Sequence, residues 1–206
     1  MEPPWPLYYG GYTGVWSPHG RYIGGGDKFG CVTLVQTAQA WNLTRYCSVL
    51  QDRVYPELQK LIAKADSQSL SIGKETRWEK SVAKAATIRD ICKQRPYQHG
   101  ADMLAAITQV LDEYTKPDQA TPAALVLQGL HALCQAEVLD IRSTWKALSP
   151  KLESDKRPLV LKALHEFFSL VPSLVVKTED YEKFKVDILS ILWSHTQTKV
   201  RYAFGF

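Results

Sequence analysis

The 206-residue sequence lacks the motifs that identify most enzymes and the runs that identify membrane proteins. It has no GxSxG elbow, no HExxH motif and no Walker glycine loop. Adjacent carboxylates occur only at Asp112–Glu113 and Glu179–Asp180, near predicted helix ends that offer no apolar pocket to separate their pKa values. No apolar run is long enough to span a bilayer. We therefore expect no enzymatic activity, no cofactor and no membrane span.

Cysteine is scarce and scattered, with four residues at positions 31, 47, 92 and 134 and no CxxC pair. A zinc site needs close pairs of ligands, and a disulfide framework needs more cysteine in a shorter chain. The N-terminus also lacks a basic segment followed by an apolar stretch, as a secretory signal would have. We expect free thiols in a cytoplasmic protein.

No strand pattern is present, whereas apolar residues recur with helical spacing from Val54 onward. Pro96, Pro117, Pro150 and Pro172 separate the helical stretches. The pattern predicts an all-α fold of antiparallel helical hairpins. The predicted helices run over about 54–65, 74–94, 98–114, 121–135, 138–148, 159–171 and 178–195, after a weaker pattern over about 35–47.

Two blocks of these helices are nearly alike. Residues 125–131 read LVLQGLH and residues 159–165 read LVLKALH, so five of seven positions match at a period of 34. Thr121 and Asp155, four residues before each block, are good helix N-caps. Chance similarity between leucine-rich helices is the alternative. We interpret the blocks as repeats of an α-solenoid of HEAT/armadillo type, since a tetratricopeptide array would need further fixed residues.

The predicted organisation has four parts. Residues 1–30 hold eight of the twelve glycines among tryptophan, tyrosine and proline, which indicates a flexible leader. Residues 31–50 form a weak helix or linker, residues 51–198 the helical-repeat domain, and residues 199–206 a tail.

One helix, over 74–95, is the best candidate for a polyanion-binding surface. Arg77, Lys80 and Lys84 share a face opposite much of the apolar stripe, which begins at Trp78. An ordinary solvated face is the alternative, since the net charge of the chain is only +4. His131 and His165 occupy equivalent repeat positions, and we interpret them as half-exposed structural residues rather than metal ligands.

Three stretches, Lys80–Cys92, Arg95–Leu104 and Thr121–Leu174, are similar to a known protein family as continuous sequence. They belong to a running similarity over residues 50–198, without a catalytic motif, by which the chain resembles the focadhesin family of HEAT/armadillo-type helical proteins. The resemblance therefore transfers no functional residue. Both ends depart from it, which indicates a fragment or isoform of a longer chain.

The resemblance implies a non-enzymatic scaffold that binds other proteins and is associated with focal adhesions. It also implies an alternative, because the wider family is linked to the Ski complex of cytoplasmic RNA decay. In that case the chain would be an adaptor whose basic helix contacts polyanions. The partners implied by the resemblance are focal adhesion components for the scaffold and Ski-complex components for the adaptor. Apolar positions off the main stripe of the last helix, Leu189 and Trp193, are expected to pack against a further helix that this chain does not contain.

Overall fold

The computed structural model describes residues 15–16, 22–23, 30–64, 74–176 and 178–204, and the chain divides into two compact units, residues 1–30 and 31–206. In the first unit, β1 (Val15–Trp16) and β2 (Tyr22–Ile23) pair antiparallel. This two-residue ladder corrects the expectation that the chain has no strand. Most of the predicted leader lies outside the described residues, so its flexibility stays a prediction.

The described residues of the second unit are helices and short connections, which confirms the all-α prediction for this part of the chain. Residues 31–50, expected to be a weak helix or a linker, form α1 and the beginning of α2. The tail expected over 199–206 continues α8 as far as Phe204. The α-helices are α1 (Gly30–Leu43), α2 (Ser48–Lys64), α3 (Lys74–Gln94), α4 (Leu104–Glu113), α5 (Ala120–Gln135), α6 (Ile141–Leu152), α7 (Pro158–Phe168) and α8 (Glu179–Phe204). Shorter turns are the π-helical η3 (Pro96–Gly100) and the 3₁₀ turns η4 (Ala101–Met103), η5 (Pro117–Gln119) and η6 (Val171–Ser173).

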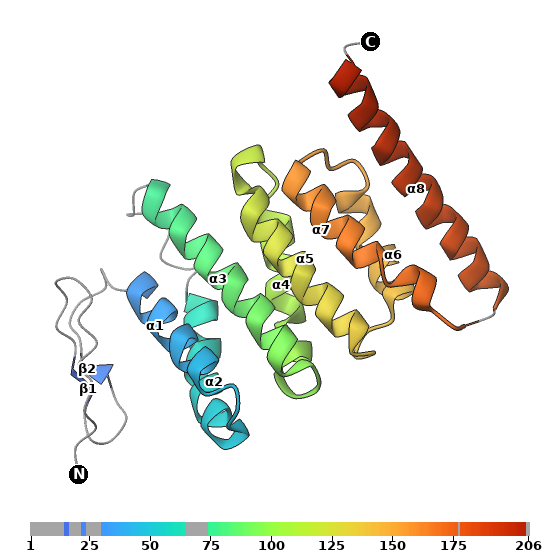
Figure 1. Ribbon diagram of the computed structural model, residues 1–206. Helices are drawn as coiled ribbons and strands as arrows, with labels where there is room; N and C mark the ends of the chain where they lie inside the picture. Colours follow the sequence, from blue (N-terminus) through green and yellow to red (C-terminus); the bar gives the residue numbers. More distant parts are fainter. Residues whose placement is uncertain (1–14, 17–21, 24–29, 65–73, 177, 205–206) are drawn as a thin grey trace. The chain divides into compact units, whose positions relative to one another are not determined.

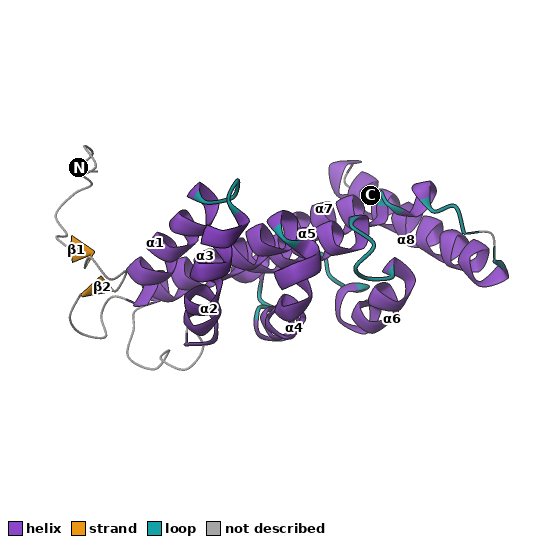
Figure 2. Cartoon of the chain, turned by 90° about the horizontal axis from the view of Figure 1, so that it is seen from below, coloured by secondary structure: helices purple, strands orange, loops and turns teal. Residues whose placement is uncertain are grey.

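The helices of the second unit lie in two layers. In one layer α3, α5 and α7 lie side by side, with α5 packed between the other two (Figure 1). Figure 2 shows α2, α4 and α6 together on one side of this row. A helix of the first layer therefore has neighbours on both flanks and beneath it.

The central helix α5 is buried nearly all round, as its apolar sequence predicts. Val126, Leu127 and Leu133 have no exposed surface, and they pack in one continuous core with residues of α3, α4, α6 and α7. Gly129 faces α3, where the Cα of Arg89 lies 3.4 Å from the position a Cβ would take. A small residue at this position lets the two helices approach closely.

The two predicted N-caps are wrong. Thr121 lies inside the first turn of α5, because the 3₁₀ turn η5 starts the helix earlier, and Gln119 is the N-cap residue. Asp155 lies two residues before the N-cap of α7, Arg157, and accepts hydrogen bonds from the backbone and side chain of that residue. Asp155 therefore pairs with the guanidinium of Arg157 instead of capping α7.

Pro150 is the one of the four predicted separators that lies inside an α-helix, since α6 continues to Leu152. Pro56 also lies inside an α-helix, α2, which begins at Ser48, earlier than the predicted start at about residue 54. An interior proline removes one backbone hydrogen bond and costs roughly 3 kcal/mol. Leu152 is almost fully buried in the core. Its burial offsets part of this cost and explains why the helix goes on for another turn.

Alanine at Gly129 is expected to be neutral or to stabilise the chain by up to about 1 kcal/mol, because glycine inside a helix is unfavourable and the added Cβ meets its neighbours at ordinary contact distance. Ala163, at the equivalent position of the repeated block, already carries that methyl group. Gly100→Ala is the matched comparison and should have the opposite effect, because its Cβ would lie 2.5 Å from Cδ2 of the buried Leu133. It should destabilise by about 1–3 kcal/mol in urea denaturation. Equal effects of the two variants would contradict this packing.

Candidate interaction surfaces

The basic face predicted on α3 is not a continuous exposed surface. Lys84 is 1% exposed and lies among the buried residues of α3, so it cannot be part of a solvent-facing polyanion site. Lys80 is half-buried, and the side chain of Arg77 lies outside the described side chains. Trp78, predicted to face inward, is 48% exposed. The structure therefore removes one of the three residues on which the polyanion hypothesis was based.

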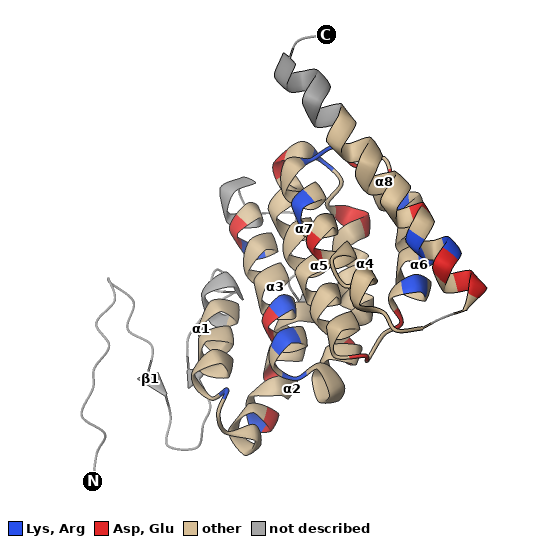
Figure 3. Ribbon diagram, turned by 45° about the vertical axis from the view of Figure 1, so that its right-hand side comes forward, with Lys and Arg blue, Asp and Glu red and all other residues tan. Residues whose placement is uncertain are grey.

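The error comes from the two-sided burial of α3. The apolar stripe marks one face, but α3 packs against α5 on one flank and contacts α1 and α2 on another. Its fully or nearly fully buried positions include the polar residues Ser81, Lys84 and Thr87. Charged residues also do not gather on one side in the view of Figure 3, where Lys and Arg are interspersed with Asp and Glu along several helices.

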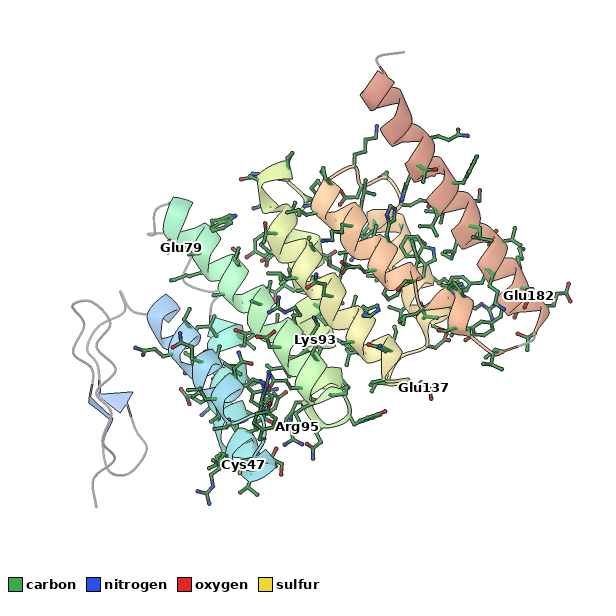
Figure 4. The ribbon with its side chains drawn as sticks, in the orientation of Figure 1. Cys47, Glu79, Lys93, Arg95, Glu137 and Glu182 are labelled. Carbon is green, nitrogen blue, oxygen red and sulfur yellow. The ribbon has the colours of Figure 1, made fainter. Side chains whose placement is uncertain are left out.

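A network of polar side chains joins α1, α2 and α3. At its centre Gln51, with no exposed surface, donates to Gln94 at 2.8 Å and accepts from Nε of Arg95 at 2.7 Å. Asn42 accepts from Gln94 and donates to Asp90 at 3.2 Å. Figure 4 shows Arg95 where α3 ends, beside the turn between α1 and α2 that holds Cys47. No motif in the sequence indicates this network; only polar residues at inward helical positions could have done so.

Beside this network, aromatic and titratable side chains from three segments pack together. The rings of Tyr55 and His99 stack with centroids 3.7 Å apart, and Trp41 meets His99 edge-on. The Tyr55 hydroxyl donates to Asp102 at 3.0 Å, and Nε2 of His99 lies 3.1 Å from Asp52. Burial first, and then the contact with Asp102, raise the pKa of Tyr55 well above its usual value. The Tyr55 hydroxyl therefore stays protonated and keeps its hydrogen bond to Asp102. Together with the ring stacking, this bond holds α2 against the η3–η4 turns.

Arg157 joins two connections of the helical stack. Its guanidinium makes a bidentate pair with Asp155, and both side chains are largely buried. Its remaining amino group donates to the backbone carbonyls of Tyr114 at 2.7 Å and Lys116 at 3.1 Å. We call these contacts of Arg157 with Asp155, Tyr114 and Lys116 the clamp. A cleft of about 820 Å³ adjoins it. The cleft is lined by Leu111, Asp112, Thr115, Pro117, Ala120, Lys151, Leu152, Ser154, Asp155, Lys156, Arg157, Pro158 and Leu159.

The repeated histidines lie half-buried on neighbouring helices, His131 on α5 and His165 on α7. Nε2 of His165 lies 3.3 Å from Nδ1 of His195, on α8. Burial lowers the pKa of His195, and the nearby His165 lowers it further. Burial also lowers the pKa of His131, with Lys93 adding to the shift and Glu166 opposing it. Among the described residues, no group of three or more His, Cys, Asp or Glu side chains is placed to hold a metal ion.

The free energy of unfolding is expected to fall as the pH drops from 7 to 5. The pKa of His195 lies below its unfolded value of about 6.5, so folding favours the neutral ring, and its contribution is lost as the pH falls below that value. His195→Gln should flatten the pH dependence measured by urea denaturation at a series of pH values. Leu159→Gln, on an exposed part of α7, is the control and should leave the slope as it is. An unchanged slope in His195→Gln would contradict the inference.

Two of the four thiols are buried and inert. Burial raises the pKa of Cys92 to about 12 and that of Cys134 to about 11, so both remain protonated at neutral pH. Cys47 is exposed at the turn between α1 and α2.

In each of the adjacent carboxylate pairs, Asp112–Glu113 and Glu179–Asp180, the aspartate forms an ion pair at the surface. Asp112 pairs with Lys151, and Asp180 pairs with Arg142 at 3.0 Å.

Exposed large apolar side chains form two groups of three or more residues on the described helices or at their connections. One group lies at the turn between α1 and α2, where Leu43, Tyr46, Val49 and Leu50 are exposed within eight residues; we call it the α1–α2 patch. The other lies on α8, where Leu189 and Trp193 are exposed, together with Val186. Among the described helices, none is both long and apolar enough to cross a membrane.

Comparison with known proteins gives consistent matches. The family model described as focadhesin/RST1, DUF3730, matches residues 32–203. Mouse and human focadhesin are each 76% identical over 149 residues, which are 72% of this chain, and zebrafish focadhesin is 58% identical over 158 residues, 76% of this chain. The matched segment covers 8% of the mouse and human proteins and 9% of the zebrafish protein. No solved structure matches the chain. Because the family model covers most of the sequence, the chain belongs to the focadhesin/RST1 family.

Proposed function

We propose that this chain is a non-enzymatic helical-repeat module that binds other proteins. The side-by-side row of α3, α5 and α7, with α4 and α6 in a second layer, supports a stack of hairpins of α-solenoid type. Most of the described titratable groups with shifted pKa values have structural partners or are buried thiols, which supports a scaffold over an enzyme. The location at focal adhesions that the family resemblance implies stays a prediction.

The α1–α2 patch carries this proposal. Leu43 and Tyr46 are among the most exposed large apolar side chains of the described part, and they stand one turn apart. The guanidinium of Arg45 lies 4.5 Å from the Tyr46 ring centroid. An aromatic side chain with an arginine beside it, within a group of apolar residues, is the composition found at the centre of protein interfaces. Clusters of this kind mark binding sites more often than single exposed leucines do.

Affinity purification of the full chain, followed by mass spectrometry, tests the proposal. The double variant Leu43→Asp/Tyr46→Asp should lose partners that the parent chain recovers. Val175→Asp/Val176→Asp, which changes two exposed apolar residues elsewhere, is the matched control and should keep them. Equal recovery with all three proteins would overturn the role of the patch. Recovery of RNA that is insensitive to these variants would favour the polyanion alternative.

A further inference from the structure

The last described helix, α8, is held against the stack along one face. Phe184 and Ile188 are buried in the core, and His195 meets His165 of α7. Near its N-terminus Tyr181 donates to Asp140, the N-cap residue of α6, and the ring lies 5.7 Å from the guanidinium of Arg142. The helix is thus packed, and its outer face is a surface of the folded unit.

The opposite face of α8 carries an apolar stripe, which we define as Val186, Leu189 and Trp193. These residues are spaced by three and four positions, so at about 3.6 residues per turn they line one side, away from Phe184 and Ile188. All three are exposed, Trp193 to 68%. Figure 1 shows α8 at the end of the row of helices, with no described helix against its outer side.

We propose that the apolar stripe is a self-association surface, on which α8 of a second copy of this chain packs antiparallel. This inference goes beyond the proposed function, because it concerns a copy of the same chain and a different face. A two-fold axis between Leu189 and Ser190 places Val186 opposite Trp193 of the partner, so a small side chain meets a large one at both ends of the stripe. Such a pairing is closed, and it stops at a dimer.

Charge favours the antiparallel arrangement. All acidic residues of α8 lie in its first nine positions, 179–187, whereas residues 188–197 contain no Asp, Glu, Lys or Arg. Parallel helices would bring the two acidic N-terminal turns together, and antiparallel helices separate them. Antiparallel pairing also opposes the helix dipoles. The uncharged central stretch can pack without burying an unpaired charge.

The small size of the stripe predicts a weak dimer. Three large side chains bury less than the roughly 800 Å² per partner of a standard interface, so we expect a dissociation constant on the order of 10–100 µM. Sedimentation velocity of the full chain should show a monomer–dimer equilibrium in this range. Leu189→Asp should raise the dissociation constant at least ten-fold, because it places two like charges beside the two-fold axis. Val175→Asp, at an exposed apolar site outside α8, is the control and should not.

Disulfide trapping tests the register independently, in a Cys31→Ser/Cys47→Ser background. Ser190→Cys lies at the axis and should form a covalent dimer on mild oxidation. Lys183→Cys lies on the same face. In the antiparallel pairing, its thiol is about 20 Å from the same thiol of the second copy, so the yield of covalent dimer should be at least ten-fold lower. A chain that stays monomeric at several hundred micromolar, oligomers larger than dimers, or equal cross-linking of the two variants would overturn the proposal.

Discussion

Replacing Arg157 by alanine is expected to lower the free energy of unfolding by about 3–5 kcal/mol. The variant leaves the Asp155 carboxylate, which is only 8% exposed, without its bidentate partner, and breaking a buried pair on one side costs about that much. It also removes the donors to the carbonyls of Tyr114 and Lys116. The two connections that this clamp joins would separate. Urea denaturation of the variant against the parent chain measures the loss.

Three control variants separate the clamp from charge alone. Arg157→Lys keeps the charge but loses the planar fork, so it should fall between the parent and the alanine variant. Lys156→Ala, at the exposed neighbouring position, should change stability by less than about 0.5 kcal/mol. Asp155→Ala/Arg157→Ala should cost less than the two single variants together, because no charge is left unpaired. A loss below 1 kcal/mol in Arg157→Ala would show that the clamp contributes little.

This clamp also shows what sequence reasoning can and cannot find. Asp155 and Arg157 are two positions apart, and the sequence suggests only an N-cap. Their carbonyl partners lie more than 40 positions earlier in the chain, at Tyr114 and Lys116, so no local pattern brings them together. Helical periodicity predicted the number and order of the main helices from α3 to α8, because it records which residues face a core.

Periodicity is less informative where a helix has more than one neighbour. Helical spacing continues the apolar stripe that begins at Trp78 through Ala85, Ile88 and Cys92 of α3, and these three residues are fully buried. It also placed Lys84 outside and Trp78 inside, and both placements are wrong. An apolar stripe marks the face with the strongest preference for burial, but a second packing partner buries residues beyond the stripe. Periodicity also places Leu189 and Trp193 off the main stripe of α8, and the structure has both side chains exposed. Their packing against a further helix stays a prediction.

Specific polar contacts accompany the apolar packing at several joints of the stack. Gln51 joins α1, α2 and α3, and Arg157 joins the connection after α4 to the one before α7. Asp140 joins α6 to α8; although burial alone would raise its pKa, hydrogen bonds from Tyr181 and Ser143 lower it below its usual range. Apolar faces alone allow helices to slide along one another. At Gln51 and at the Arg157–Asp155 pair, which are buried or largely buried, any other register would leave a polar group without its partner, so these contacts favour one register.

Replacing Phe168 by alanine is expected to cost about 3–5 kcal/mol, the second large effect, because it opens a cavity between the two layers. The Phe168 ring of α7 is almost fully buried and meets Trp145 of α6 edge-on, with centroids 4.7 Å apart. It also contacts Phe167, with centroids 5.7 Å apart. Thermal and urea denaturation give the loss in stability. Near-ultraviolet circular dichroism should weaken, since Trp145 loses the aromatic partner that fixes its orientation.

The same helix offers the control. Leu159, nine positions earlier on α7, is half exposed, so Leu159→Ala should cost less than about 1 kcal/mol although it removes an apolar side chain of similar type. The difference in free energy of unfolding between the two variants separates the contribution of burial between the layers from the contribution of helix propensity in α7. If both variants lost the same stability, or if Phe168→Ala left the aromatic dichroism unchanged, α7 would not be packed on α6 through this ring.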